Sequence, residues 1–159
     1  MPLEELQREL AASLAGRGPS PAGLDERTVE RTRRSLESKR RRAAAHLLPH
    51  IRKALGNTWA ERFHEHAQRY VPDGLLHHVD DAWELAETLQ RDGGPDIRDA
   101  ADSDLAALKL RYVRDPKLRG DRIRERRGWL FAWVRRPHRA LVVRLPGGPG
   151  KVWTLRLPF

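Results

Sequence analysis

The chain has no cysteine in its 159 residues. This absence excludes disulfides, thiolate nucleophiles, iron–sulfur clusters and cysteine-ligated zinc. No apolar run approaches the roughly 20 residues that a membrane-spanning helix needs, so we expect no membrane partner. Residues 1–14 carry three glutamates and one arginine and lack the apolar stretch of a secretory signal. We therefore expect a cytoplasmic protein.

Motifs for catalysis are also missing. The five serines fit no nucleophile motif. The glycine-rich run at 147–150 contains Pro149, which cannot donate an N–H to a phosphate, and is typical of a turn between strands. His46 and His50 have the spacing of a helical metal pair, but Pro49 lies between them and favours a helix break.

Asp96, Asp99, Asp102 and Asp104 form an acidic run. The acids at the start of this run suit a helix N-terminus, and solvation explains the others better than a metal site does. We therefore predict a protein that is not an enzyme and has no catalytic residue, no metal and no cofactor.

Positive charge is abundant but unevenly distributed. The net charge of +9 divides into −1 for residues 1–24, +6 for 25–54, −8 for 55–108 and +12 for 109–159. Arginine outnumbers lysine 26 to 5, which a GC-rich genome alone can produce, but genome composition does not sort charge by segment. An acidic middle between two basic stretches can steer partners of opposite charge to different faces.

Residues 1–115 are predicted to form a helical domain. Apolar residues recur at helical spacing, and Gly or Pro separates the repeats. Asp25 is the expected N-cap of a long arginine-rich helix, and Thr58 with Glu61 fits a capping box. The expected helices span 3–14, 26–46, 49–55, 59–70, 79–90 and 96–112.

Residues 116–159 are predicted to form a second domain with a basic connector, 117–127, and a small sheet. The strands expected from alternation and turn residues span 129–134, 141–145 and 152–157. The predicted fold class is α+β, with a bundle of about six helices followed by a three-stranded antiparallel sheet.

An exposed edge of this sheet could bind a peptide as an additional strand. The segments 141–145 and 152–157 are the candidate edges, and the nearby arginines favour an acidic peptide. Ordinary core packing is the alternative role for the aromatic rings. The residues proposed to bind the peptide are Trp129, Phe131, Trp133, Leu141, Val143 and Trp153.

Nucleic acid is the alternative partner. The segments 31–42 and 117–127 are rich enough in arginine to contact phosphates, although such clusters are unspecific. The acidic segment 55–108 would have to face away from DNA. The candidate phosphate contacts are Arg34, Arg41, Arg42, Arg122, Arg124, Arg126 and Arg127.

The order of features in residues 3–113 resembles a bacterial family labelled as a DNA-binding domain. Its better understood members are partner subunits of multinuclear non-haem iron oxidases of the methanobactin type. The similarity is to a high-GC branch with its own short C-terminal domain. The segments that carry it are 3–14, 21–25, 33–36, 39–40, 55–63, 67–72, 81–86 and 104–108.

This resemblance implies a non-catalytic subunit for natural-product biosynthesis. Such a subunit forms a heterodimer with an iron-dependent peptide-modifying oxidase and presents a ribosomally synthesised precursor peptide to it. The iron and its ligands belong to the oxidase. The short arginine-rich C-terminal part departs from the methanobactin type. The residues expected to dock the oxidase are Trp59, Phe63, Trp83, Arg33 and Arg40.

Overall fold

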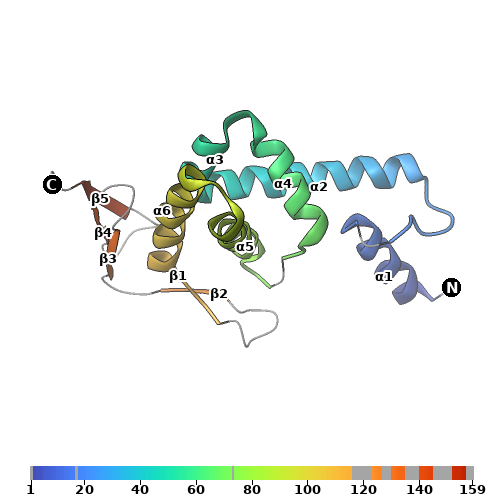
Figure 1. Cartoon of the computed structure of the whole chain (residues 1–159). Helices are drawn as coiled ribbons and strands as arrows, with labels where there is room; N and C mark the ends of the chain where they lie inside the picture. Colours follow the sequence, from blue (N-terminus) through green and yellow to red (C-terminus); the bar gives the residue numbers. More distant parts are fainter. Residues whose placement is uncertain are drawn as a thin grey trace.

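The computed structural model describes residues 2–16, 18–72, 74–115, 123–126, 130–134, 140–144 and 152–156. Helices come first and strands follow, so the observed elements agree with the expected α+β class (Figure 1). The helical elements are α1 (Leu3–Leu14), α2 (Glu26–Leu47), α3 (Pro49–Leu55), the 3₁₀ turn η1 (Gly56–Thr58), α4 (Trp59–Arg69), α5 (His77–Asp92) and α6 (Pro95–Arg111). Among the described helices, none combines the length and the apolarity needed to cross a membrane.

The long helix α2 begins as predicted at Asp25. The Asp25 carboxylate accepts the Thr28 hydroxyl at 2.6 Å, the Thr28 N–H at 3.0 Å and the Arg27 N–H at 3.4 Å. The hydrogen bonds from Thr28, followed by that from Arg27, hold the pKa of Asp25 below its ordinary value. Figure 1 shows the N-terminal part of α2 reaching beyond the other helices toward α1.

The start of α4 differs from the prediction. Thr58 has helical backbone angles and makes no side-chain cap; its hydroxyl donates instead to the Leu55 carbonyl at 2.9 Å. The predicted capping box is therefore wrong, because a capping residue needs an extended backbone to reach the next N–H groups. Gly56, at φ +51°, ends α3, and the turn η1 leads directly into α4.

The hydrophobic core lies among α2 to α6, with α5 at its centre (Figure 1). Helix α5 is buried around most of its circumference, because α2 and α6 both pack against it. The apolar stripes expected on α4 and α5 face this core. Its members with no exposed surface are Ala44, Leu48, Ile51, Phe63, Val79, Ala82, Ala86 and Ala101.

A hairpin that was not predicted follows α6. Helix α6 ends at Arg111, and β1 (Tyr112–Arg114) pairs antiparallel with β2 (Ile123–Glu125). Helix α6 thus ends within one residue of the predicted end at about 112, but the prediction of a basic connector at 117–127, with strands only after it, missed β1 and β2. The reason is Ile123, which is 6% exposed and packs into the helical core. The hairpin also links the two sides of the expected domain boundary after residue 115.

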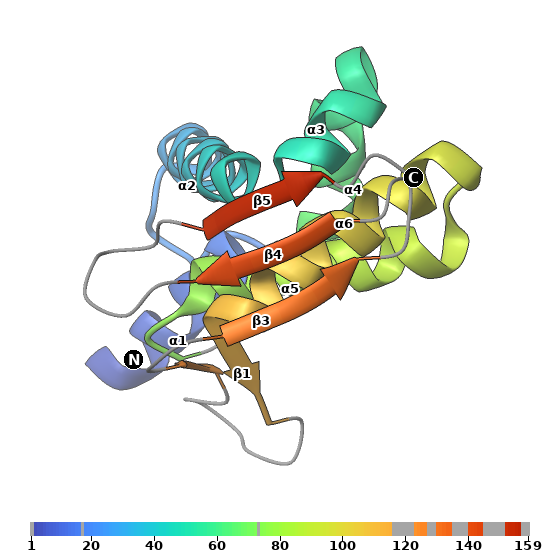
Figure 2. The same cartoon turned by 90° about the vertical axis from the view of Figure 1, so that its left-hand side faces the viewer.

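The last three strands form a separate antiparallel sheet in the order β3–β4–β5 (Figure 2). They are β3 (Leu130–Val134), β4 (Ala140–Arg144) and β5 (Val152–Arg156). The sheet lies beside α6, which contacts β3 and β4. The predicted three-stranded antiparallel sheet is therefore present, and the hairpin of β1 and β2 adds a two-stranded sheet that was not predicted.

Candidate functional site

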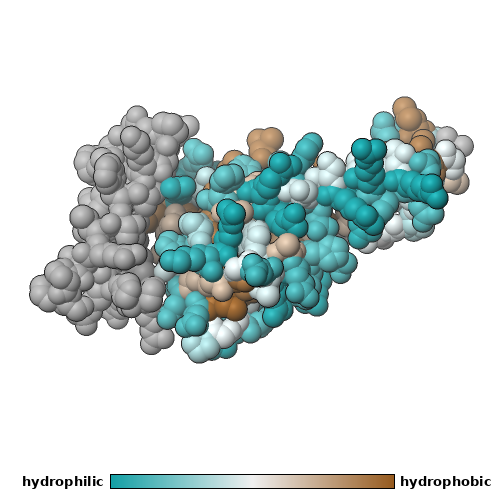
Figure 3. Space-filling model, turned by 90° about the horizontal axis from the view of Figure 1, so that it is seen from above, coloured by the Kyte–Doolittle hydropathy of each residue, from teal (hydrophilic) through white to brown (hydrophobic). Residues whose placement is uncertain are grey.

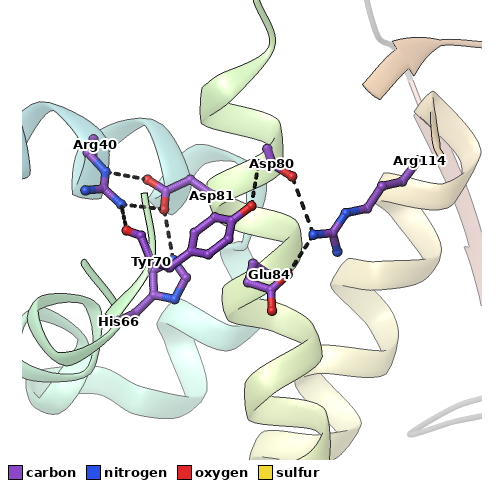
Figure 4. A network of polar contacts seen from close by, with 7 residues as sticks. All are labelled: Arg40, His66, Tyr70, Asp80, Asp81, Glu84 and Arg114. Atoms are coloured by element: carbon purple, nitrogen blue, oxygen red, sulfur yellow. Dashed lines mark hydrogen bonds and ion pairs between the residues drawn. The ribbon is translucent and has the colours of Figure 1, made fainter. Parts of the chain in front are cut away.

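A network of buried charges lies where α2, α4 and α5 meet (Figure 4). Asp81 is 1% exposed and accepts two hydrogen bonds from the Arg40 guanidinium, each at 2.9 Å. The Nε2 atom of His66 lies 2.8 Å from the same carboxylate. Arg40 also donates to the Tyr70 carbonyl at 2.9 Å. One guanidinium therefore ties α2 to α5 and to the C-terminal end of α4.

The network continues through Tyr70 to the first hairpin. The Tyr70 hydroxyl donates to Asp80, whose other oxygen lies 3.5 Å from Arg114 on β1. Arg114 also donates to Glu84 at 2.6 Å and to Glu87 at 2.8 Å. Three carboxylates of α5 thus surround one arginine, and Figure 4 shows Asp80, Glu84 and Arg114 converging. These contacts anchor β1 to the helical core.

Asp81 and Arg114, the central residues of the two parts of the network, both keep their charged forms. Burial acts to raise the pKa of Asp81, but hydrogen bonds from His66 and Arg40 outweigh it and hold that pKa below its ordinary value. Burial acts to lower the pKa of Arg114, but Glu84 and the neighbouring acids outweigh it and raise that pKa. Because fixed partners already hold Asp81 and Arg114, we assign the network a structural role.

Asp104 of α6 caps the neighbouring helix α3. Its carboxylate accepts the Ile51 N–H at 2.8 Å and the His50 N–H at 3.3 Å, and it lies 2.7 Å from the His50 ring. Helix α3 has no side-chain cap of its own. Burial raises the pKa of Asp104 above its ordinary value despite these hydrogen bonds. This carboxylate therefore replaces the missing local cap through a tertiary contact.

The histidines and acids considered as metal ligands do not gather at one point, although His50 and Asp104 contact each other. His46 is exposed, whereas His50 contacts Asp104. Asp96 lies in the first turn of α6, and Asp102 accepts a hydrogen bond from Gln90. In the part of the chain that the structure describes, no three His, Asp or Glu side chains gather in a way that could hold a metal ion.

The aromatic residues predicted to dock a partner lie in the core. Phe63 has no exposed surface, Trp83 is 4% exposed and Trp59 is 8% exposed. The prediction that these rings form a docking surface is therefore wrong, because their apolar surface is already buried in the helical core. Arg40 belongs to the buried network, whereas Arg33 is partly exposed beside α1.

The basic residues of α2 divide between the network and a solvent-exposed face. Arg31, Arg34 and Arg42 are exposed, and the helical repeat places them on one side of α2, with the partly buried Arg41 beside them. Figure 3, which views the molecule from above α2, shows strongly hydrophilic side chains over this helix. Arg124 and Arg126 are also exposed. Arg122 and Arg127 lie outside the described residues.

The residues predicted to bind a peptide map onto the last sheet. Leu141 and Val143 lie on β4, which is the central strand, so the prediction that 141–145 is an edge is wrong. The cause is the order β3–β4–β5, in which β4 pairs on both sides. In the pairing of β4 with its two neighbouring strands, Val143 lies opposite Phe131 of β3 and Trp153 of β5, and Leu141 lies opposite Trp133 of β3. Trp129 lies outside the described residues.

Sequence reasoning missed the buried network, although one signal was present. Asp80 and Asp81 stand next to Val79 and Ala82 in a helix whose apolar residues include Leu85. At about 100° per residue, Leu85 lies on nearly the same side of the helix as Asp81. An acid on an apolar face indicates a buried partner. The partner could not be named, because Arg40 lies 41 residues away in sequence.

The comparisons with known proteins give a family but no function. The model of the family described as "SCO6045-like, C-terminal domain" matches residues 4–91. This span runs from α1 through most of α5 and contains Arg40, His66 and Asp81. Searches of curated proteins and of solved structures found no match. Because the matched span exceeds half of the 159 residues, the chain belongs to the SCO6045-like, C-terminal domain family.

Proposed function

We propose that this protein is a non-catalytic adaptor. It forms a heterodimer with an iron-dependent peptide-modifying oxidase and presents a ribosomally synthesised precursor peptide to that enzyme. The proposal draws on the resemblance of residues 3–113 to such partner subunits. In this arrangement the oxidase supplies the iron and its ligands, and the adaptor supplies binding surfaces.

The observation that carries the proposal is the position of β5. Among the described strands, β5 pairs only with β4, so one of its two sides presents backbone N–H and C=O groups to a further strand. An extended peptide can add to such an edge, with backbone hydrogen bonds for affinity. The opposite edge strand, β3, contacts α6, which makes β5 the better candidate. The charge of +12 in residues 109–159 would attract an acidic peptide.

The buried network also supports a binding role over a catalytic one. Asp81 and Arg114 are each held by fixed partners, and Asp81 is 1% exposed. A general base must reach a substrate proton within hydrogen-bond distance. These groups do not have that access, and their contacts are better explained by the stability of the helical core.

Co-expression tests the heterodimer, and substitution in β5 tests the peptide site. The chain is co-expressed with each iron-dependent oxidase that its neighbouring genes encode, and one of these oxidases should co-purify with it as a complex of one copy each. Two separate monomers would refute the adaptor function.

A pair of proline variants, Thr154→Pro and Leu155→Pro, then locates the peptide. Successive N–H groups of an edge strand alternate between the neighbouring strand and the open side. One of the two variants should therefore keep the sheet and weaken binding of the oxidase's precursor peptide by about tenfold or more. If the variant that keeps the sheet also keeps full affinity, β5 is not the peptide site.

We infer nucleic-acid binding as the second candidate function, and the exposed arginines on one face of α2 favour it. A mobility-shift assay with duplex DNA at about 50 mM salt tests this function, because phosphate-dominated affinity falls by decades as salt rises. The variant Arg34→Glu with Arg42→Glu should abolish any shift. Failure to retard any duplex at this salt concentration removes the candidate.

A further inference from the structure

A groove opens between α1, α2 and the start of α5, far from the last sheet. Its volume is about 580 Å³, within the roughly 300–1,000 Å³ typical of ligand sites. The floor is α2, one wall is α1, and the other wall is formed by the end of α4, the residues that follow it and the start of α5. The apolar residues that line it include Ala11, Leu14, Leu36, Ala43, Ala67 and Val71.

The floor of the groove contains Leu36 and Ala43, apolar residues of α2 that are not members of the hydrophobic core. Its lining residues run from Arg33 to Ala43, which corresponds to roughly 15 Å of helix. Leu36 stands in the middle of this floor and is 40% exposed. A site of this length, with its apolar residues in a row, suits about three turns of a second helix better than a compact small molecule.

The charges around the groove favour an acidic occupant. Lys39 lines the groove and is exposed, and it makes no hydrogen bond or ion pair with the described residues. Arg33 is partly exposed, and its contact with Glu30 is long, at 3.9 Å. Glu37 is the single carboxylate among the described lining residues, and it already lies 3.0 Å from the His64 ring.

We propose that this groove binds an amphipathic, acidic helix of a partner protein. The apolar face of that helix lies on Leu36 and the alanines of α1 and α4, and its flanking Glu or Asp residues face Lys39 and Arg33. A second copy of this chain is a poorer occupant, because two chains of net charge +9 repel each other. The groove lies at the end of the molecule opposite to β5 (Figure 1), so this surface is additional to the adaptor function and does not depend on it.

A designed peptide pair tests the proposal on the full chain. One fluorescein-labelled peptide of about 18 residues, long enough to form a helix, carries leucines at helical spacing and glutamates on both flanks. Its counterpart carries lysines in place of the glutamates. By fluorescence anisotropy we expect the acidic peptide to bind at least about tenfold more tightly than the basic one. Equal affinities, or no binding of either peptide, would overturn the proposal.

Three charge variants locate the binding site. Leu36→Glu places a charge on the floor and should weaken binding of the acidic peptide by about tenfold or more, and Lys39→Glu should weaken it several-fold. Lys53→Glu makes the same charge change on the exposed face of α3, outside the groove, and should leave the affinity within about twofold. Circular dichroism checks that each variant is folded.

Two results of these variants contradict the proposal. Unchanged affinity in Leu36→Glu and Lys39→Glu would place the peptide elsewhere. Sedimentation that shows wild-type dimers, dispersed by Leu36→Glu, would identify a second copy of the chain as the occupant.

Discussion

Replacing Asp81 by Asn tests whether the buried network stabilises the helical core. The variant keeps nearly the same shape but leaves one acceptor oxygen for the two Arg40 donors and His66. Breaking a buried ion pair from one side costs about 3–5 kcal/mol. Arg40 keeps 21% of its side chain exposed and retains the Tyr70 carbonyl, so we expect the lower end, about 3 kcal/mol. This is a large share of the roughly 5–15 kcal/mol that stabilises a domain.

The matched control is Glu30→Gln. Glu30 also pairs with an arginine at 2.8 Å, but the Glu30 side chain is 43% exposed and that of Arg34 is 79% exposed. Such a surface pair contributes about 0–1 kcal/mol. Both free energies of unfolding are measured in urea by tryptophan fluorescence and circular dichroism. If Asp81→Asn costs no more than Glu30→Gln, the reasoning is refuted. A double-mutant cycle with Arg40→Ala should give strongly non-additive losses.

Three further predictions concern titration, capping and packing. The folded-state pKa of Asp81 lies below its ordinary value of about 3.8, so the ionised Asp81 carboxylate stabilises the fold above that pH, and this stability is lost as the pH falls further. Urea midpoints between pH 5 and 2 should therefore decrease less in Asp81→Asn than in wild type. Parallel curves for the two proteins would contradict this. The pKa of Asp104 is raised by burial, so ionisation of Asp104 in the folded state carries a cost that grows as the pH rises through the folded-state pKa. Asp104→Asn should change the free energy of unfolding by less than about 1 kcal/mol, whereas Asp104→Ala leaves α3 without its cap and should cost about 1–3 kcal/mol. Equal losses of the two variants in urea would reject the capping role. Gly16 has φ +74°, and a Cβ there would lie 2.7 Å from the Arg33 guanidinium. Gly16→Ala should therefore destabilise α1 by about 1–2 kcal/mol, measured as faster hydrogen exchange in α1 with exchange in α5 unchanged. Unchanged exchange in α1 would count against this prediction.

Local patterns predicted most helix boundaries because the signals lie within a few residues of each boundary. Asp25 starts α2 through its own hydrogen bonds to Arg27 and Thr28, and Pro49 opens α3. The same reasoning failed at Thr58, where the preceding turn keeps the backbone helical. It also missed the hairpin of β1 and β2, which depends on the burial of Ile123 against helices that are distant in sequence.

The site was harder to predict than the fold. The apolar spacing of Trp59, Phe63 and Trp83 correctly placed these rings on helix faces, but spacing alone does not distinguish a buried face from a docking face. The groove between α1 and α2 depends on where two helices meet, and no local pattern reports that. The sheet edge likewise depends on strand order, which placed β4 at the centre and β5 at the side.

The sequence by itself determined the fold class, the charge distribution along the chain and the chemistry excluded by the absence of cysteine. These properties follow from composition and short-range periodicity. Only the tertiary structure decided which charged side chains are paired inside the protein and which are exposed and available to a partner. Arg40 and Lys39 are neighbours in the same basic run, yet one is bound to a buried carboxylate and the other is exposed to solvent. The physical reason is that the desolvation of a charged side chain and its pairing depend on packing between segments that are distant in sequence. Burial therefore makes one arginine of a basic run part of the core.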